Sequence, residues 1–167
     1  MISIPILQPS LNFYKNVPIS LPLIPVMTSN TAPSGIAGGS WDYSRTDPDV
    51  SVTFNSTMAY YVFDNNIYTE LWSRSPLIVG YSTYQFSSPK VVTRLYIMSY
   101  GFFGGSLTFQ GSHDGTSYNN IGNNPYILND SIDDTFTNTT PYSYYKISFN
   151  TTPTGGEGIR TIQLYGY

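Results

Sequence analysis

The sequence predicts an all-β protein, an antiparallel jelly-roll β-sandwich with an extended N-terminal arm. Short segments alternate apolar and polar residues with the period of a strand, and clusters of Gly, Pro, Asn and Asp separate them. No segment combines a helical period with helix caps. A chain of 167 residues is long enough for one domain with a substantial core. Regularly spaced short strands favour a sandwich of the jelly-roll type.

The first 26 residues differ from the rest, because they are rich in Ile, Leu and Val but contain the prolines Pro5, Pro9, Pro18, Pro22 and Pro25. Proline removes a backbone donor and is not tolerated inside helices. Such an apolar segment needs a surface, which is either its own domain or a neighbouring subunit. We assign residues 1–26 as an extended, Pro-rich docking arm and residues 27–167 as the sandwich.

The expected strands follow a turn-rich loop region at residues 27–49. They are Val50–Phe54, Leu77–Phe86, Val91–Met98, Leu107–Gln110, Tyr144–Phe149 and Ile159–Tyr165, with a short aromatic run, Tyr60–Phe63, among them. The strand at Leu107 leads into a polar corner with an Asp114-Gly115 pair. This pair is a strong turn signal, because Gly accepts positive φ and Asp bonds its own backbone. Tyr118 is expected to return from the corner as an aromatic plug of the sandwich.

The composition limits the classes of partner. Only 10% of the residues are charged, against about 25% in ordinary soluble domains, whereas 16% are aromatic. A surface built from Asn, Ser, Thr and Tyr suits assembly into a larger particle or hydrogen bonding to sugars. The net charge is -3 and no basic run occurs, which argues against nucleic-acid binding. The absence of Cys excludes disulfides, zinc-thiolate sites and thiol catalysis.

The sequence gives no sign of catalysis. No paired carboxylates, phosphate loop or nucleophile motif stands out, and we expect a protein that is not an enzyme. His113 is expected to be a surface residue of the turn, and the Asp133-Asp134 pair a solvated turn in a polar loop. The N-terminus does not read as a signal peptide, and no apolar stretch is long enough to span a bilayer.

Three motifs occur in a recognisable order. Val62–Thr69 reads VFDNNIYT, with Trp72 shortly after it; Phe109–Tyr118 reads FQGSHDGTSY; and Ile159–Gly166 reads IRTIQLYG. Over about residues 27–167, this order resembles the discoidin family, also called coagulation factor 5/8 type C domains. Modules of bacterial glycosidases share its galactose-binding-like fold. The run Pro25–Gly35 also looks like the opening of discoidin-like modules in phage tail and fibre proteins.

The resemblance implies a calcium site. In many relatives an FDGN-x-x-T corner and a closing Glu hold one calcium, and the matching positions here are Asp64, Asn66, Thr69 and Gln163. Calcium takes hard oxygen ligands, including loop carbonyls. Because Gln replaces the usual Glu, the set has one formal negative charge. The alternative is that Asp64 caps a turn and Gln163 hydrogen-bonds the loop directly.

The resemblance also implies a ligand surface at one end of the sandwich, where the loops 38–49, 71–75 and 99–105 converge. The candidate ligand-binding residues on these loops are Trp41, Tyr43, Arg45, Arg74, Tyr100, Phe102 and Phe103. Aromatic rings offer a flat face to the C–H side of a sugar, and Arg bonds its hydroxyls. The alternatives are that Phe102 or Phe103 folds inward to cap the core, and that Trp72 belongs to the core.

We interpret the chain as a non-catalytic virion structural protein, a capsid decoration, minor capsid or tail/fibre subunit that is able to bind host-surface glycans. Its partners would be other virion proteins, through residues 1–26, in an oligomeric assembly formed in the host cytoplasm. The arm, the missing signal peptide and cysteines, and the fibre-like opening motivate this setting. The alternatives are a purely structural cement or fibre subunit without ligand, a carbohydrate-binding module, and a membrane-surface lectin that uses Phe102 and Phe103.

Overall fold

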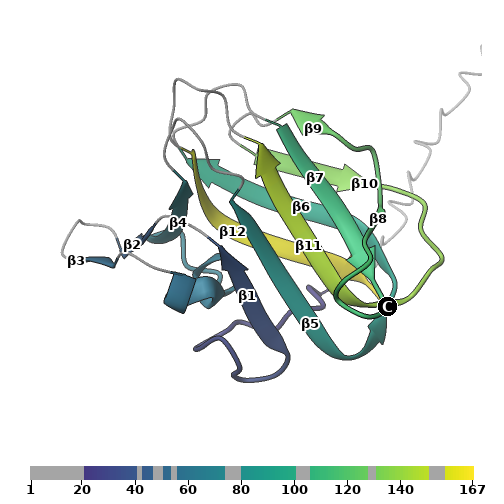
Figure 1. Ribbon diagram of the computed structural model, residues 1–167, viewed down its shortest axis with the longest axis horizontal. Helices are drawn as coiled ribbons and strands as arrows, with labels where there is room; N and C mark the ends of the chain where they lie inside the picture. The colour runs from purple at the N-terminus through teal and green to yellow at the C-terminus, as the bar shows by residue number, and fades with distance from the viewer. Residues whose placement is uncertain are drawn as a thin grey trace, which may run out of the picture.

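Two antiparallel sheets face each other in the computed structural model (Figure 1). The structure describes residues 21–40, 43–46, 51–53, 56–73, 80–100, 106–127, 131–150 and 157–167. The C-terminus lies beside the turn between the fifth and sixth strands, where Tyr167 and Val91 exchange two backbone hydrogen bonds of 2.8 and 3.0 Å. The predicted all-β sandwich is confirmed.

The first sheet has the strand order β1-β5-β11-β7-β8, with β9 also paired to β7. These strands are β1 (Ile36–Ser40), β5 (Tyr81–Lys90), β7 (Ser106–Ser112), β8 (Asn119–Asn120), β9 (Tyr126–Ile127) and β11 (Tyr142–Asn150). The second sheet has the order β10-β6-β12-β4-β2-β3. Its strands are β2 (Tyr43–Thr46), β3 (Ser51–Thr53), β4 (Thr69–Ser73), β6 (Val92–Tyr100), β10 (Ser131–Thr135) and β12 (Glu157–Gly166). From β5 to β7 and from β10 to β12, each successive strand lies in the opposite sheet.

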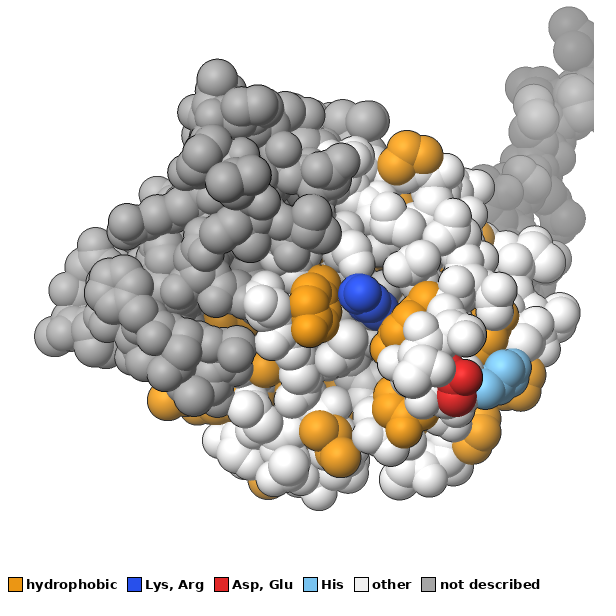
Figure 2. All heavy atoms as spheres, in the orientation of Figure 1, with side chains coloured by type: hydrophobic (Ala, Val, Ile, Leu, Met, Phe, Trp, Pro, Cys, Tyr) orange, Lys and Arg blue, Asp and Glu red, His pale blue; other side chains and the backbone are white. Residues whose placement is uncertain are grey.

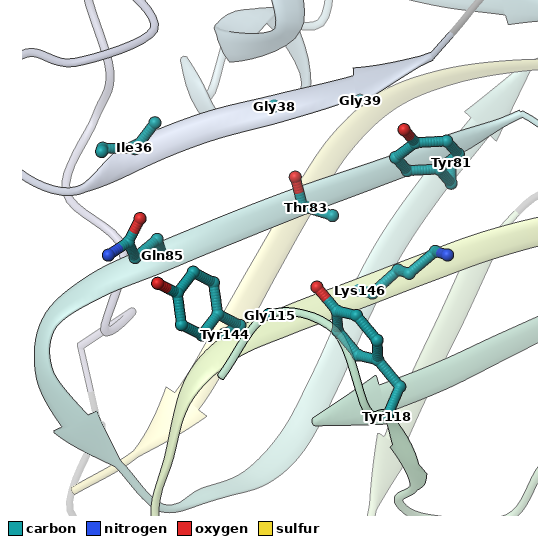
Figure 3. A pocket seen from close by; sticks show the side chains of 10 residues that line it. All are labelled: Ile36, Gly38, Gly39, Tyr81, Thr83, Gln85, Gly115, Tyr118, Tyr144 and Lys146. Atoms are coloured by element: carbon teal, nitrogen blue, oxygen red, sulfur yellow. The ribbon is translucent and has the colours of Figure 1, made fainter. Parts of the chain in front are cut away.

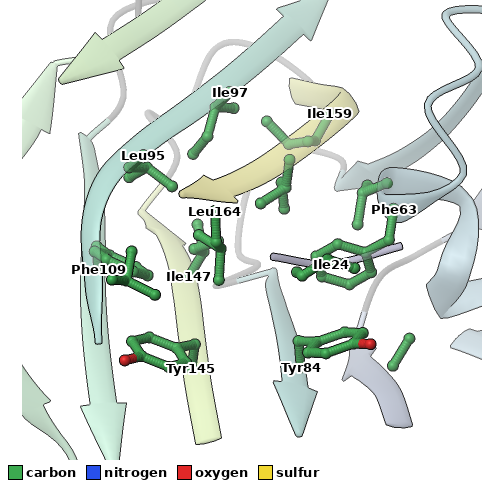
Figure 4. Packing of buried hydrophobic residues seen from close by; sticks show 14 of the residues in the cluster. Ile24, Phe63, Tyr84, Leu95, Ile97, Phe109, Tyr145, Ile147, Ile159 and Leu164 are labelled. Atoms are coloured by element: carbon green, nitrogen blue, oxygen red, sulfur yellow. The ribbon is translucent and has the colours of Figure 1, made fainter. Parts of the chain in front are cut away.

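Strand alternation explains the core, because one side chain in two points between the sheets. Tyr84 and Phe86 of β5 are buried, as are Tyr145 of β11 and Phe109 of β7. The rings of Phe109 and Tyr145 stack, with centroids 5.7 Å apart, and Phe86 meets Tyr145 edge-on at 5.8 Å. Figure 4 shows Tyr84, Phe109 and Tyr145 facing the aliphatic side chains of β6 and β12, such as Leu95 and Leu164. The aromatic and aliphatic layers together fill the sandwich.

Several elements differ from the sequence prediction. The expected loop region 27–49 contains β1 and β2, and β4 and β10 were not expected. The aromatic run Tyr60–Phe63 belongs to a 3-10 helix, η1 (Ser56–Phe63), which contacts β1 of one sheet and β4 and β12 of the other. Ala59, Val62 and Phe63 are buried there. These three side chains belong to the core cluster, so η1 closes one side of the sandwich.

Residues 21–26 of the predicted arm pack on the chain's own domain. The backbone N–H of Leu23 donates to the carbonyl of Leu164 at 2.7 Å, and the side chain of Ile24 is buried in the core. These residues therefore lie on their own domain, although they form no strand there. Residues 1–20 lie outside the described residues, so their docking role stays a prediction.

The corner after β7 forms the expected tight turn. Oδ1 of Asp114 accepts the backbone N–H groups of Thr116 and Ser117 at 2.8 and 2.9 Å, and Gly115 has φ of 75°. Hydrogen bonds to the Asp114 carboxyl hold its pKa far below its usual range. The backbone N–H of Ser117 has the largest effect, and that of Thr116 the next largest. The prediction for Tyr118 was wrong: its ring is only half-buried and lies 5.3 Å from Nζ of Lys146 on the outer face of the sheet. The polar corner returns the chain over that face and not between the sheets.

Candidate functional site

Four residues on neighbouring strands of the second sheet lie opposite one another in one row, near the ends of the predicted ligand loops. In the register, Tyr43 lies opposite Trp72, Trp72 lies opposite Gly158, and Gly158 lies opposite Tyr100. The segments 38–49, 71–75 and 99–105, predicted as loops, each include a residue of this row, which lies in β2, β4 and β6 respectively. Antiparallel pairing therefore brings the backbones of three segments, far apart in sequence, to one end of one sheet.

The structure does not describe the side chains of the seven predicted ligand-binding residues. Tyr43, Arg45 and Tyr100 have described backbones, and Arg45 lies opposite Glu70 in the register of β2 and β4. The positions outside the described residues are Trp41, Arg74, Phe102 and Phe103. The ligand-binding roles of all seven residues stay predictions.

Three of the four predicted calcium ligands share one oxygen cluster. The hydroxyl Oγ1 of Thr69 lies 2.7 Å from Oδ2 of Asp64, 2.9 Å from the carbonyl oxygen of Asn66 and 3.3 Å from that of Tyr61. A hydroxyl has one proton to donate, so it can satisfy only one of these three acceptors at a time. Convergent oxygens that share too few protons are a suitable donor set for a hard cation.

The Asp64 carboxylate in this cluster has no cationic side chain paired with it among the described residues. Its Oδ1 accepts the backbone N–H of Asn66 at 2.9 Å. Burial raises the pKa of Asp64 to about 6, although the hydrogen bonds from Thr69 and Asn66 act in the opposite direction. Partial burial of an unpaired carboxylate is unfavourable, and a bound cation would relieve that cost.

Gln163 has other partners in this structure. Its amide Nε2 donates to Oδ1 of Asn65 at 2.8 Å, and its Oε1 accepts the hydroxyl proton of Tyr165. The side chain thus hydrogen-bonds the corner loop directly, as in the alternative given by the sequence. In the part of the chain that the structure describes, no group of three His, Cys, Asp or Glu could hold a metal. Asp64, Asn66 and Thr69 fit calcium by their chemistry, whereas the fourth position offers an amide to the loop.

His113 is exposed in the corner, as expected, and its ring lies 4.8 Å from that of Tyr142. The prediction of a solvated turn at Asp133-Asp134 was wrong, because both residues lie in β10. Nε and Nη2 of Arg94 donate to the two oxygens of Asp133 at 2.7 and 2.8 Å. Pairing with β6 gives this polar segment its strand conformation.

No helix among the described residues is long and apolar enough to cross a membrane.

A groove that the sequence analysis missed lies on the outer face of the first sheet (Figure 3). Tyr81, Tyr144 and Lys146 line it from β5 and β11, and Tyr118 closes it from the corner. The missed signal was the outward half of each alternating strand. Among the outward positions of β5 and β11 are Tyr81, Tyr144 and Lys146, which lie beside smaller polar residues such as Thr83.

Comparisons with known proteins identify the fold. No protein-family model and no curated protein matches the chain. Among solved structures, a variant of chitosan-binding module 1 from a Paenibacillus sp. IK-5 chitosanase/glucanase has a TM-score of 0.58 at 19% identity, and the match covers 83% of this chain and 98% of that one. A Clostridium perfringens module in complex with GalNAc-β-1,3-galactose has a TM-score of 0.57 at 13% identity, with 74% and 92% covered.

A pectin-binding carbohydrate-binding module is also similar, with a TM-score of 0.52 at 13% identity and with 62% of this chain and 76% of that one covered. These neighbours are carbohydrate-binding modules, and one similar module comes from a family 31 glycoside hydrolase. At such identities the likeness concerns the fold. The chain therefore shares the β-sandwich fold of these modules.

Proposed function

We propose that the chain is a non-catalytic carbohydrate-binding module that binds glycans through the loops 38–49, 71–75 and 99–105. The observation that supports this most directly is the register row of Tyr43, Trp72, Gly158 and Tyr100, which gathers these loops at one end of the sandwich. The solved neighbours with this fold are carbohydrate-binding modules. The proposal favours the carbohydrate-binding alternative over a purely structural role.

The chemistry of the loop residues suits a sugar ligand. Trp41, Phe102 and Phe103 offer apolar rings to the C–H faces of a pyranose, and Arg45 and Arg74 offer several donors to its hydroxyls. The neighbours bind chitosan, GalNAc-β-1,3-galactose and pectin, so the fold is compatible with different sugars. The loop side chains would choose among them.

A glycan array with the full chain, followed by calorimetry on the best ligand, tests this proposal. Replacing Phe102 and Phe103 with Ser together should weaken binding by about tenfold or more, since each lost aromatic contact is worth about 1 kcal/mol or more. Tyr167→Ser is the matched control, because it removes an exposed ring beside Val91, which precedes β6, whereas the segment 99–105 lies at the other end of β6. Binding of no glycan, or equal binding by the loop variant and the control, would contradict the proposal. Liposome binding that the loop variant loses would favour the membrane-surface alternative.

We also propose calcium as a structural ion at Asp64, Asn66 and Thr69. When bound, it would supply positive charge to oxygens that share too few protons and would fasten the corner after η1. Adding calcium at about 100 times its dissociation constant should stabilise the folded chain by about 2.7 kcal/mol relative to chelator. Asp64→Asn should abolish this difference, whereas Asp133→Asn should not. An equal melting temperature in calcium and in chelator would rule the ion out.

The virion setting is proposed from the sequence alone. It rests on the Pro-rich segment and on the resemblance of Pro25–Gly35 to fibre modules. Because Ile24 is already buried in the chain's own core, docking onto other virion proteins falls to residues 1–20. Deleting these residues should lower the oligomeric state in sedimentation while glycan binding persists. Unchanged assembly after the deletion would argue against a docking arm.

A further inference from the structure

The groove on the outer face of the first sheet has a volume of about 320 Å³, at the small end of the range for small-molecule sites. Strand alternation builds it: Tyr84 and Phe86 of β5 point into the core, so Tyr81, Thr83 and Gln85 point outward. One wall is β1, where a Cβ on Gly38 would come within 2.7 Å of Oγ1 of Thr83, so a side chain there would crowd the groove. The glycine keeps this edge of the groove open.

A single lysine gives the groove its charge. Nζ of Lys146 lies 4.6 Å from the ring centroid of Tyr81 and 5.3 Å from that of Tyr118, between the two rings (Figure 3). It is the one charged residue among those that line the groove. No carboxylate pairs with Lys146 in the described part of the chain. Figure 2 shows a basic side chain flanked by apolar ones on this face.

The surroundings hold the ammonium in place without neutralising it. Cation–π contacts orient a lysine over tyrosine rings but leave its formal charge and its N–H donors available to a ligand. The protein as a whole has a net charge of -3. Lys146 therefore offers a carboxylate a local positive charge on a protein that is acidic overall.

We infer that the groove is a second saccharide site, separate from the loop end, and that it takes a sugar ring bearing a carboxylate. Lys146 would pair with the carboxylate, and the rings of Tyr81, Tyr118 and Tyr144 would contact the C–H faces of the sugar. The phenol hydroxyls and the Gln85 amide offer both donors and acceptors to the remaining sugar hydroxyls. This inference rests on the proposed function, because it extends sugar binding to a second face.

Calorimetry with trigalacturonate and with its methyl ester tests the inference on the full chain. The ester keeps the rings but removes the charge, so it should bind about tenfold or more weakly, the loss expected for one charge-assisted hydrogen bond. Lys146→Gln should lower the affinity for the acid by a similar factor and leave the ester within about twofold. Lys146→Arg should retain most of the acid's affinity. Sialyllactose against lactose, in a parallel arm, shows whether a sialic acid supplies the carboxylate instead of a uronic acid.

Lys90→Gln is the matched control, since it removes the same charge from the far end of β5, outside the groove. Equal losses in Lys90→Gln and Lys146→Gln, or an ester that binds as tightly as the acid, would overturn the inference. A dimer in sedimentation that Lys146→Gln disrupts would also overturn it, because the groove would then be a contact between copies. Binding of a neutral glycan that the Phe102 and Phe103 variant loses, together with no preference for the acid, would refute only this second site. Failure to bind any saccharide would refute both proposals.

Discussion

The side chain of Asn124 hydrogen-bonds the backbone of β7 at Phe109, where neither β8 nor β9 pairs with that strand. Both β8 and β9 pair with β7, through Gln110 opposite Asn120 and Leu107 opposite Tyr126, and Phe109 falls between these pairings. The backbone N–H of Phe109 donates to Oδ1 of Asn124 at 2.5 Å. Nδ2 of Asn124 donates to the carbonyls of Phe109 and Ile121 at 2.9 and 2.5 Å. The side-chain amide thus offers one acceptor and one donor group, as a peptide bond would.

Replacing Asn124 with Ala should destabilise the protein by about 2–4 kcal/mol. The change leaves the N–H of Phe109 and the carbonyl of Ile121 without these partners, and each unsatisfied group costs about 1–3 kcal/mol. The carbonyl of Phe109 keeps the backbone N–H of Ile121 at 2.9 Å, so it adds little. Because Asn124 is only partly buried, water can offset some of the loss, which keeps the expected cost below the upper sum.

Equilibrium urea unfolding measures this cost as a change in the free energy of unfolding. Asn120→Ala is the control, because the Asn120 side chain accepts one exposed hydrogen bond from Gln110 at 3.1 Å, and it should cost less than about 1 kcal/mol. Similar costs for the two variants would refute the reasoning. It would then follow that water replaces the Asn124 amide along the edge of β7.

Further predictions concern backbone strain, pH and surface charge. Gly35→Ala should cost about 1–3 kcal/mol in urea unfolding, since Gly35 has φ of 76° and a Cβ would meet the Tyr84 hydroxyl at 2.3 Å. In chelator, Asp64→Asn should raise stability above about pH 6 by about 1–2 kcal/mol, discounted for partial exposure. The gain should vanish near the ordinary pKa of 3.8, because a pKa raised to about 6 means that the folded state loses stability as pH rises through that value. Asp133→Asn should change stability by less than about 1 kcal/mol, because its ion pair with Arg94 is exposed. Three results would contradict these expectations. They are a stability difference between Asp64→Asn and the wild type that does not change with pH, a Gly35→Ala variant as stable as the wild type, and an Asp133→Asn variant that loses more than about 1 kcal/mol.

The long alternating strands and the polar corner could be predicted from the sequence because their causes are local. Tyr144–Phe149 alternates strictly, and that pattern alone selects an extended conformation with one buried face. Asp114 and Gly115 form their turn through bonds within a few residues. Asp64, Asn66 and Thr69 hydrogen-bond one another since they lie within one short corner, and their role as calcium ligands stays a prediction.

The remaining features depend on pairing between distant segments. β1 contains two glycines and no clear alternation, and it is a strand because β5 satisfies its backbone. The acidic segment of β10 is extended because β6 lies beside it. The groove around Lys146 needs β1, β5, β11 and the corner at once, so no single segment reveals it. The sequence by itself determined which stretches can be strands and which faces are apolar. The tertiary structure decided which strands are neighbours and in which register they pair. The backbone N–H and C=O groups of a strand can pair with those of any other strand, whatever side chains the two strands carry.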